Sequence, residues 1–125
     1  MIYGIGTDIV AVVRMESLFR RYGERALEKL LAPSEREACR NSTVPGRFLA
    51  KRYAAKEAFG KALGTGLRAP ALLPAIAVVH DALGKPGFVF AATLAENVAE
   101  RGLVSHLSIS DEVDHAIAFV ILEQT

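Results

Sequence analysis

Residues 52–66 read RYAAKEAFGKALGTG, and this stretch decides the fold because it predicts a long central helix with two packed faces. The helix is expected over residues 47–63. At 100° per residue, one face is an ordinary hydrophobic stripe and the other consists of small residues around one carboxylate and one ammonium group. The stripe holds Phe48, Ala55, Phe59, Ala62 and Leu63, and the small-residue face holds Ala50, Tyr53, Ala54, Glu57, Gly60, Lys61 and Gly64. Small residues allow another group to come close, so we expect both faces to be packed.

Glu57 and Lys61 lie one helical turn apart, and two interpretations of this pair are open. One is an ordinary ion pair of the favourable i,i+4 order, which contributes only a few tenths of a kcal/mol. The other is a binding site, because the helix ends at Gly64-Thr65-Gly66, and successive N–H groups in such a turn can bind an anion. A helix C-terminus repels an anion, and Lys61 would offset that repulsion. Turns of this kind are also ordinary helix C-caps.

Asp8 follows a strand predicted over residues 2–7, in which Gly4 and Gly6 allow a close approach of another backbone. Gly4, Gly6 and Asp8 project to the same side of an extended strand. Asp8 and Glu57 together supply two hard oxygen ligands. These are too few for a closed calcium site but suit Mg²⁺, which keeps waters and takes phosphate oxygens from a substrate. The alternative for Asp8 is a helix N-cap.

The remaining segments predict short helices and mostly antiparallel strands. Helices are expected over residues 12–22 and 24–31, and two Ser/Thr-x-x-Glu capping boxes predict helix starts at Ser34 and Thr93. Strands are expected over residues 75–80, 88–92, 104–110 and 115–122, the last two joined as a hairpin by residues 111–114. These elements predict a single α+β domain over residues 1–125, with a mostly antiparallel sheet packed against the long central helix.

The strand over residues 104–110 has one polar face. His106, Ser108 and Ser110 alternate to one side, and Leu107 and Ile109 point to the other. A strand of this kind is either exposed to solvent on its polar face or lines a site.

Charge is distributed unevenly along a chain of 125 residues whose formal net charge is only +1. Residues 1–68 hold 13 Lys/Arg and 7 Asp/Glu, whereas residues 69–125 hold 2 and 7. The first part can attract an anion such as a nucleotide, a nucleic acid or an acidic protein. The alternative is that these charges lie on solvated helix faces.

Several classes of protein are excluded by composition and motifs. Cys39 is the single cysteine, which rules out an internal disulfide framework and a multi-cysteine zinc site. The N-terminal residues 1–10 lack the positive region of a secretory signal, and no apolar run approaches the ~20 residues that span a bilayer. We therefore expect a cytoplasmic protein with no membrane partner. Neither a P-loop nor a dinucleotide-binding fingerprint is complete.

Taken together, these segments resemble one family, the holo-acyl-carrier-protein synthases, which are the short bacterial type of 4′-phosphopantetheinyl transferase. The resemblance covers nearly the whole chain. It rests on GIGTDIV at residues 4–10, RFLAKRYAAKEAFGKALGTG at 47–66, LGKP at 83–86 and HLSISD at 106–111. It implies the 4′-phosphopantetheinyl transferase fold. It also implies a reaction that moves the 4′-phosphopantetheine arm of coenzyme A onto a serine of apo acyl carrier protein, releases adenosine 3′,5′-bisphosphate and serves fatty-acid biosynthesis.

The resemblance also implies roles for individual residues. Asp8 and Glu57 would hold Mg²⁺ against the diphosphate of coenzyme A, and Lys61 would bind the same phosphates. These three form the expected catalytic group, and the hypothesis for the base is Glu57, directly or through a metal-bound water. The resemblance implies that the diphosphate also contacts Gly64, Thr65 and Gly66, and that the phosphate end of the nucleotide contacts Arg52 and His106. The adenosine would contact Gly84, Lys85 and Pro86. The acidic helix of the carrier protein would contact Arg14, Arg21 and Arg25. The family further implies a homotrimer with active sites between subunits.

Two other functions compete with this interpretation. The first is a catalytically idle trimeric module that binds acidic protein partners through the basic residues between Arg14 and Arg25. Intact Asp8, Glu57 and Lys61 argue against it. The second is a nucleic-acid binder that uses the basic part of the chain, but aromatic residues are not interleaved with basic ones on its strands, so we expect no nucleic-acid partner.

Overall fold

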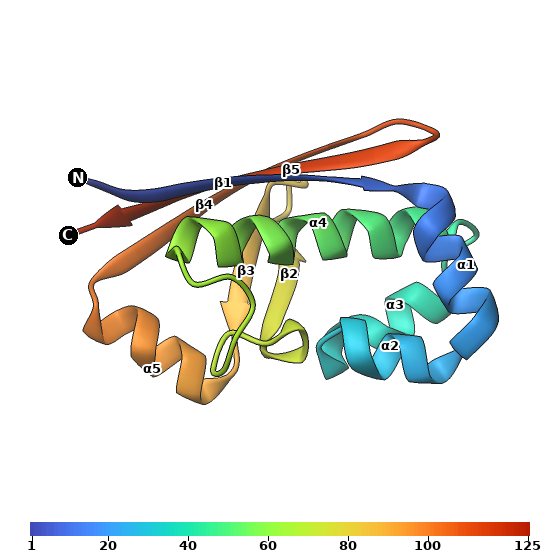
Figure 1. The fold of residues 1–125 in the computed structure, drawn as a ribbon, viewed down its shortest axis with the longest axis horizontal. Helices are drawn as coiled ribbons and strands as arrows, with labels where there is room; N and C mark the ends of the chain where they lie inside the picture. The colour runs from blue at the N-terminus through green and yellow to red at the C-terminus, as the bar shows by residue number, and fades with distance from the viewer.

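A long helix beneath a three-stranded sheet organises the molecule, whose computed structural model describes residues 1–125 (Figure 1). The helix, α4, spans Pro45–Leu63. The sheet has the strand order β1-β5-β4, and both pairings are antiparallel. Its strands are β1 (Ile2–Ala11), β4 (Leu103–Asp111) and β5 (His115–Gln124). The predicted α+β class, with antiparallel strands packed against a central helix, is confirmed.

Most of the remaining elements lie on the side of α4 away from this sheet, and a second pair of strands passes behind α4 and reaches the sheet (Figure 1). Strands β2 (Ile76–His80) and β3 (Pro86–Phe90) form a separate antiparallel pair. The helices are α1 (Val12–Tyr22), α2 (Glu24–Leu30), α3 (Arg36–Arg40) and α5 (Ala92–Glu100), with 3₁₀ turns η1 (Pro33–Glu35) and η2 (Leu73–Ala75). None of the helices combines the length and the apolar character needed to cross a bilayer.

Strand β1 lies directly on α4, and two glycines make that approach possible. A Cβ atom added to Gly4 would lie 2.0 Å from the carbonyl oxygen of Ala62, and one added to Gly6 would lie 2.0 Å from that of Ala58. The expected close backbone approach is confirmed. The strand does not end at residue 7, however, because its pairing with β5 continues to Ala11.

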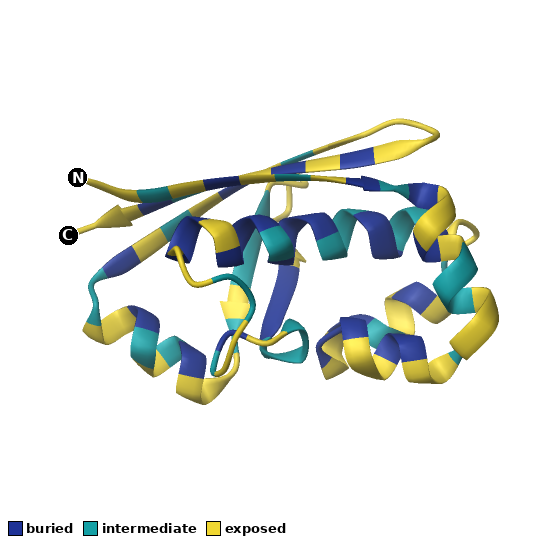
Figure 2. Ribbon diagram, in the orientation of Figure 1, coloured by how far each residue is buried: buried dark blue, intermediate teal, exposed yellow.

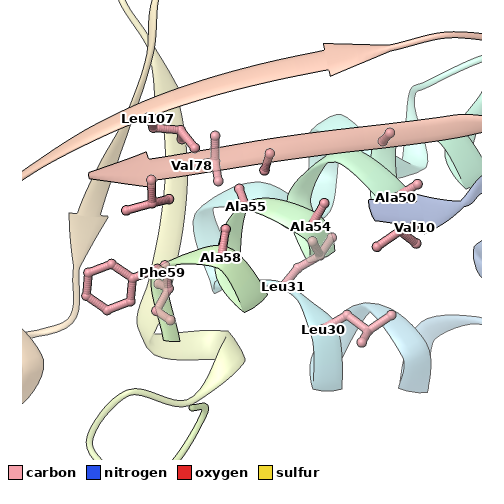
Figure 3. Close-up of a cluster of buried hydrophobic side chains, with 14 of the residues drawn as sticks. Val10, Leu30, Leu31, Ala50, Ala54, Ala55, Ala58, Phe59, Val78 and Leu107 are labelled. Atoms are coloured by element: carbon pink, nitrogen blue, oxygen red, sulfur yellow. The ribbon is translucent and has the colours of Figure 1, made fainter. Parts of the chain in front are cut away.

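The two faces of the three-stranded sheet differ in what covers them. Side chains facing α4 are buried, and those of β5 are Ala116, Ala118, Val120 and Leu122. Figure 2 shows this alternation along β1 and β5, and Figure 3 shows part of the core, where Ala54, Ala58 and Phe59 of α4 meet the strands. The outer face carries a group of exposed apolar side chains, namely Ile5, Ile9, Val104, Ile117 and Phe119. No other element of the chain lies over them (Figure 1).

Both predicted capping boxes are wrong. Helix α3 begins at Arg36, after η1, and no side chain caps it. Helix α5 begins at Ala92, ahead of Thr93, and also lacks a side-chain cap. Instead, the backbone N–H of Ala91 donates to the carbonyl of Ala75 at 2.9 Å, which fixes where α5 begins. A tertiary backbone bond thus overrides the local signal, and β3 starts two residues earlier than expected because Pro86 pairs with His80.

Candidate active site

Asp8 and Lys61 join strand β1 to helix α4. Asp8 lies within β1, on the side that faces the helix, so the alternative of a helix N-cap is excluded. The Lys61 ammonium donates to Asp8 Oδ1 at 3.1 Å and to the carbonyl of Thr7 at 2.9 Å. Lys61 therefore pairs with Asp8 from another element, and the ordinary i,i+4 pair with Glu57 does not form. The Asp8 side chain is 18% exposed and that of Lys61 is 53% exposed, so the pair is open to a ligand.

Glu57 stands one turn before Lys61, on the same helix face and half-buried. Its carboxylate lies beside the hydroxyl of Tyr53, and burial together with this carboxylate raises the pKa of Tyr53. The guanidinium of Arg14, from α1, sits over the Tyr53 ring at 5.3 Å. Glu57 is therefore bordered by a neutral hydroxyl that can donate to it, and Tyr53 links it to the basic face of α1.

The donor set formed by Asp8 and Glu57 fits a small, hard cation. Both carboxylates come from the region where β1 crosses α4, and no group of three or more His, Cys, Asp or Glu side chains forms a denser cluster. Mg²⁺ is commonly held by one or two carboxylates and completes its shell with water and phosphate oxygens. Two carboxylates beside a lysine therefore match what a Mg²⁺–diphosphate ligand requires.

The turn after α4 is a helix C-cap. Gly64 and Gly66 have φ values of 87° and 72°, which favour glycine, and their N–H groups donate to the carbonyls of Lys61 and Gly60 at 3.0 Å. A Cβ atom at Gly60 would lie 2.9 Å from the carbonyl carbon of Gly66, which explains a glycine in the middle of the last turns. Because Gly64 and Gly66 already donate within the chain, an anion at this turn would meet exposed Thr65 and the Lys61 side chain.

Arg52 and His106 lie away from the Asp8–Lys61 pair within one chain. Nine residues separate Arg52 from Lys61, which at 100° per residue places them on opposite sides of α4. Arg52 Nη1 donates to Glu35 Oε2 at 2.9 Å and to the carbonyl of Val78 in β2. His106 projects from the outer face of β4, with its Nε2 2.6 Å from Glu123 Oε1. The structure thus separates these predicted phosphate contacts from the carboxylates.

The turn between β2 and β3 is ordered by one carboxylate. Asp81 Oδ1 accepts hydrogen bonds from the backbone N–H groups of Lys85 and Leu83, both at 2.9 Å, and these bonds lower the pKa of Asp81. Gly84 has a φ of 87° within the turn. Gly84 and Lys85 are consequently held in a fixed, exposed loop ahead of Pro86. The adenosine contact predicted for them is sterically open.

Close to this turn, Arg52 has cationic neighbours that sequence reasoning did not single out. Partial burial lowers the pKa of His80, and the positive charges of Arg52 and Lys51 add to the effect. Lys51 and Arg47 both lie 4.0 Å from the carboxylate of Asp111 at the end of β4. The segment Arg47–Arg52 therefore adds a cluster of positive charge to the side of α4 that faces β2 and β4.

A groove lies between α1 and α2, and Arg25 is the one of the three predicted carrier-binding arginines that lines it. Arg14, Arg21 and Arg25 are all exposed. The groove between the two helices has a volume of about 420 Å³, and its lining combines apolar side chains with two cations: Leu18, Tyr22, Arg25, Ala26, Lys29 and Leu30. An apolar floor with a basic rim suits an amphipathic, acidic helix.

Two buried ionisable residues were missed or left open by the sequence. Lys56 is 0% exposed and forms an ion pair with Glu35 at 2.6 Å. Burial is the main cause that lowers the pKa of Lys56 to about 8. Cys39 is also buried, and burial raises the pKa of its thiol to about 11, so the thiol is neutral and inert at physiological pH.

Comparisons with known proteins agree with this arrangement. A model of the 4′-phosphopantetheinyl transferase superfamily matches residues 4–120. The chain is 59% identical over 123 residues to the holo-[acyl-carrier-protein] synthase of Dechloromonas aromatica, covering 98% of each chain. It is similar to the crystal structure of this synthase from Neisseria meningitidis, with a TM-score of 0.94, 44% identity, and coverage of 99% of this chain and 100% of the other. It is also similar to the Bacillus anthracis synthase in complex with CoA (3′,5′-ADP), with a TM-score of 0.83, 33% identity, and coverage of 100% and 99%.

Proposed function

Because this chain belongs to the 4′-phosphopantetheinyl transferase superfamily, we propose that it acts as a holo-[acyl-carrier-protein] synthase. Such an enzyme transfers the 4′-phosphopantetheine arm of coenzyme A to a serine of apo acyl carrier protein and releases adenosine 3′,5′-bisphosphate. The observation that carries the proposal is the pairing of Asp8 with Lys61 where β1 crosses α4, with Glu57 one turn earlier on the same helix face, in a chain whose relatives bear this name over nearly their full length.

The chemistry requires charge stabilisation at the diphosphate. The serine hydroxyl attacks the β-phosphorus, the bond to the leaving adenosine 3′,5′-bisphosphate breaks, and negative charge accumulates on the leaving group. Lys61 is held by Asp8 and by the carbonyl of Thr7, and it directs an exposed ammonium group at this site. A preorganised positive group of this kind is worth about 10²–10³ in rate.

Asp8 and Glu57 would hold Mg²⁺, which when bound neutralises the phosphate oxygens of the diphosphate. Glu57 is also our candidate for the base that takes the serine proton. The half-buried carboxylate lies beside Tyr53, whose hydroxyl can orient it. These assignments are supported by the donor set and by the match to the family motif.

We further propose that the site is completed by a second copy of the chain, within a homotrimer. Asp8 faces α4 from β1, whereas His106 projects from the opposite face of the same sheet, on the strand at its other edge. Arg52 and Lys61 likewise lie on opposite sides of α4. One coenzyme A molecule can touch Asp8 and Lys61 as well as Arg52 and His106 only if one copy contributes the first pair. A neighbouring copy then contributes the second pair. The uncovered apolar face of the sheet gives such copies a surface to bury.

A charge placed on that apolar face is expected to dissociate the oligomer. Phe119, 42% exposed, stands in the middle strand of the sheet, and Phe119→Glu would bury an unpaired carboxylate in the interface. We expect a monomer by light scattering and loss of most transfer activity. Val89→Glu is the matched control, because Val89 is 56% exposed on β3, away from this face. If Phe119→Glu remains trimeric, this face is not part of the interface between copies.

The carrier protein is proposed to dock on the groove between α1 and α2. Removing Arg25, which lines the groove, together with Arg21, whose guanidinium lies over the ring of the groove residue Tyr22, is expected to raise the KM for the carrier about 10-fold in Arg21→Ala/Arg25→Ala and to leave the KM for coenzyme A unchanged. The difference should shrink at high salt, since exposed charges are screened. Arg40→Ala, which removes an exposed arginine paired with Glu24, is the control. An unchanged carrier KM would place the docking surface elsewhere.

The function is tested by weighing an apo acyl carrier protein after incubation with this protein, coenzyme A and Mg²⁺. We expect the carrier to gain the mass of one phosphopantetheine group. The gain should disappear with EDTA and with Asp8→Ala. No gain, while the carrier remains bound, would favour the idle binding module instead.

The setting of the reaction is proposed from the same resemblance. We place the enzyme in the cytoplasm, acting as one domain over residues 1–125 for fatty-acid biosynthesis. A single buried, unpaired cysteine is in keeping with a reducing compartment.

A further inference from the structure

Glu35 is a buried carboxylate that the proposed chemistry does not use. It is 2% exposed and accepts four hydrogen bonds. Oε1 accepts from the backbone N–H of Ala32 at 2.8 Å and from Lys56 Nζ at 2.6 Å. Oε2 accepts from Arg52 Nη1 at 2.9 Å and from the backbone N–H of Val78 at 3.0 Å. One side chain from η1 thereby ties α4 to β2.

Lys56 and Arg52, the two cations bound to Glu35, differ in whether they have N–H groups left to bind a ligand. Lys56 Nζ also donates to the carbonyls of Leu30 at 2.9 Å and Leu73 at 3.1 Å, so its three protons are all used. Arg52 donates both of its hydrogen bonds from Nη1, which leaves Nη2 and Nε for a ligand. Its guanidinium also lies 4.5 Å from the ring of Phe48, and its side chain is 13% exposed.

The charges of this cluster do not cancel. One carboxylate faces two cations, so the cluster of Glu35, Lys56 and Arg52 carries a net positive charge, and only Arg52 has N–H groups left to present to a ligand. Buried cation pairs are tolerated only when hydrogen bonds hold them, and here Glu35 supplies those bonds. The net positive charge is therefore directed at the surface next to His80 and the turn that carries Gly84 and Lys85.

We propose that Glu35 is a positioning residue for the nucleotide end of coenzyme A. It fixes the guanidinium of Arg52 and, through Val78, the strand that leads into the turn at Gly84–Pro86. The two contacts expected for the nucleotide thus keep a constant separation before the ligand arrives. This inference rests on the proposed function, since it assumes that Arg52 binds a phosphate of coenzyme A.

The test measures the binding of adenosine 3′,5′-bisphosphate by calorimetry in EDTA, so that the metal and the diphosphate play no part. Glu35→Gln is expected to weaken binding about 10-fold, and Arg52→Ala to weaken it by a similar factor. Because part of the effect of Glu35 is exerted through Arg52, the loss in the double variant should be clearly smaller than the product of the two single losses, which would be about 100-fold. The KM for the carrier should stay unchanged, and Glu24→Gln, which removes an exposed ion pair, should bind normally.

A purely structural role would give other results. Normal binding by a folded Glu35→Gln, losses that multiply in the double variant, or an equal loss of carrier affinity would each overturn the proposal. If Glu35→Gln does not fold, Glu35→Gln/Lys56→Met removes the buried unpaired ammonium as well, and the same expectations apply to it. Wild-type protein that neither binds the nucleotide nor modifies the carrier would contradict the proposed function itself.

Discussion

Replacing Asp8 by asparagine is expected to slow phosphopantetheine transfer by about 10³-fold and to change stability little. Asparagine has the size of aspartate but lacks the charge that holds Lys61 and that would hold a metal ion. The ion pair itself is half exposed on the lysine side, so its loss costs at most ~1 kcal/mol of folding free energy. The initial rate of carrier modification at saturating Mg²⁺ measures the effect, and thermal unfolding checks the fold.

Asp114→Asn is the matched control for this prediction. Asp114 lies in the exposed turn between β4 and β5, where only its backbone carbonyl is used, as the acceptor for the N–H of Val12 at 2.8 Å, and its carboxylate makes no hydrogen bond. Its rate should equal that of the wild type. If Asp8→Asn instead keeps half of the wild-type rate or more, Asp8 takes no part in the chemistry, and the metal assignment fails with it.

Replacing Gly6 by alanine is expected to destabilise the fold by ~4 kcal/mol or more. The new Cβ would lie 2.0 Å from the carbonyl oxygen of Ala58 and 2.8 Å from the N atom of Ala62. Both are backbone atoms of α4, so no side chain can move aside, and β1 would have to lift off the helix. Urea unfolding measures the change.

Gly87→Ala serves as the control, because a Cβ atom at Gly87 meets nothing within 4 Å and its φ is not positive. We expect a change of about 0.5 kcal/mol or less there. A loss below ~1 kcal/mol for Gly6→Ala would mean that β1 and α4 can separate without cost. The geometry that brings Asp8 to Lys61 would then not be held by this contact.

The elements that sequence predicts well here are those with strong local signals. The central helix was expected over residues 47–63 and spans Pro45–Leu63, and the hairpin at residues 104–122 forms as expected. Alternation along β4 also holds, with Leu107 buried and His106 exposed. Likewise the shared side of Gly4, Gly6 and Asp8 follows from the two-residue repeat of a strand, which no tertiary contact alters.

The features that sequence missed depend on residues far apart in the chain. Lys61 pairs with Asp8 across 53 positions, and Lys56 with Glu35 across 21. A helical wheel places Lys56 between the two faces of α4 but cannot show that a carboxylate from η1 meets it there. Similarly, β1 runs past Asp8 only because β5 pairs with it up to Ala11, which no local pattern near Asp8 indicates.

The candidate site likewise combines residues that local patterns predict with residues that only long-range contacts position. Strand side and helix face together predict that Asp8 and Glu57 meet. By contrast, helix geometry places Arg52 opposite Lys61, but only the bonds to Glu35 and Val78 show that the guanidinium is held on that side, which decides whether one chain suffices. The proposed mechanism therefore depends most on two copies of the chain sharing each site.

Sharing of the site is tested by coexpressing two inactive variants with different tags and purifying the oligomers that carry both. One variant is Asp8→Asn, and the other is Arg52→Ala/His106→Ala. In a ring of three identical head-to-tail interfaces, any mixed trimer contains one intact site, so we expect about one third of the wild-type transfer rate. Mixed trimers that are folded but as inactive as their parents would contradict a site built from two copies.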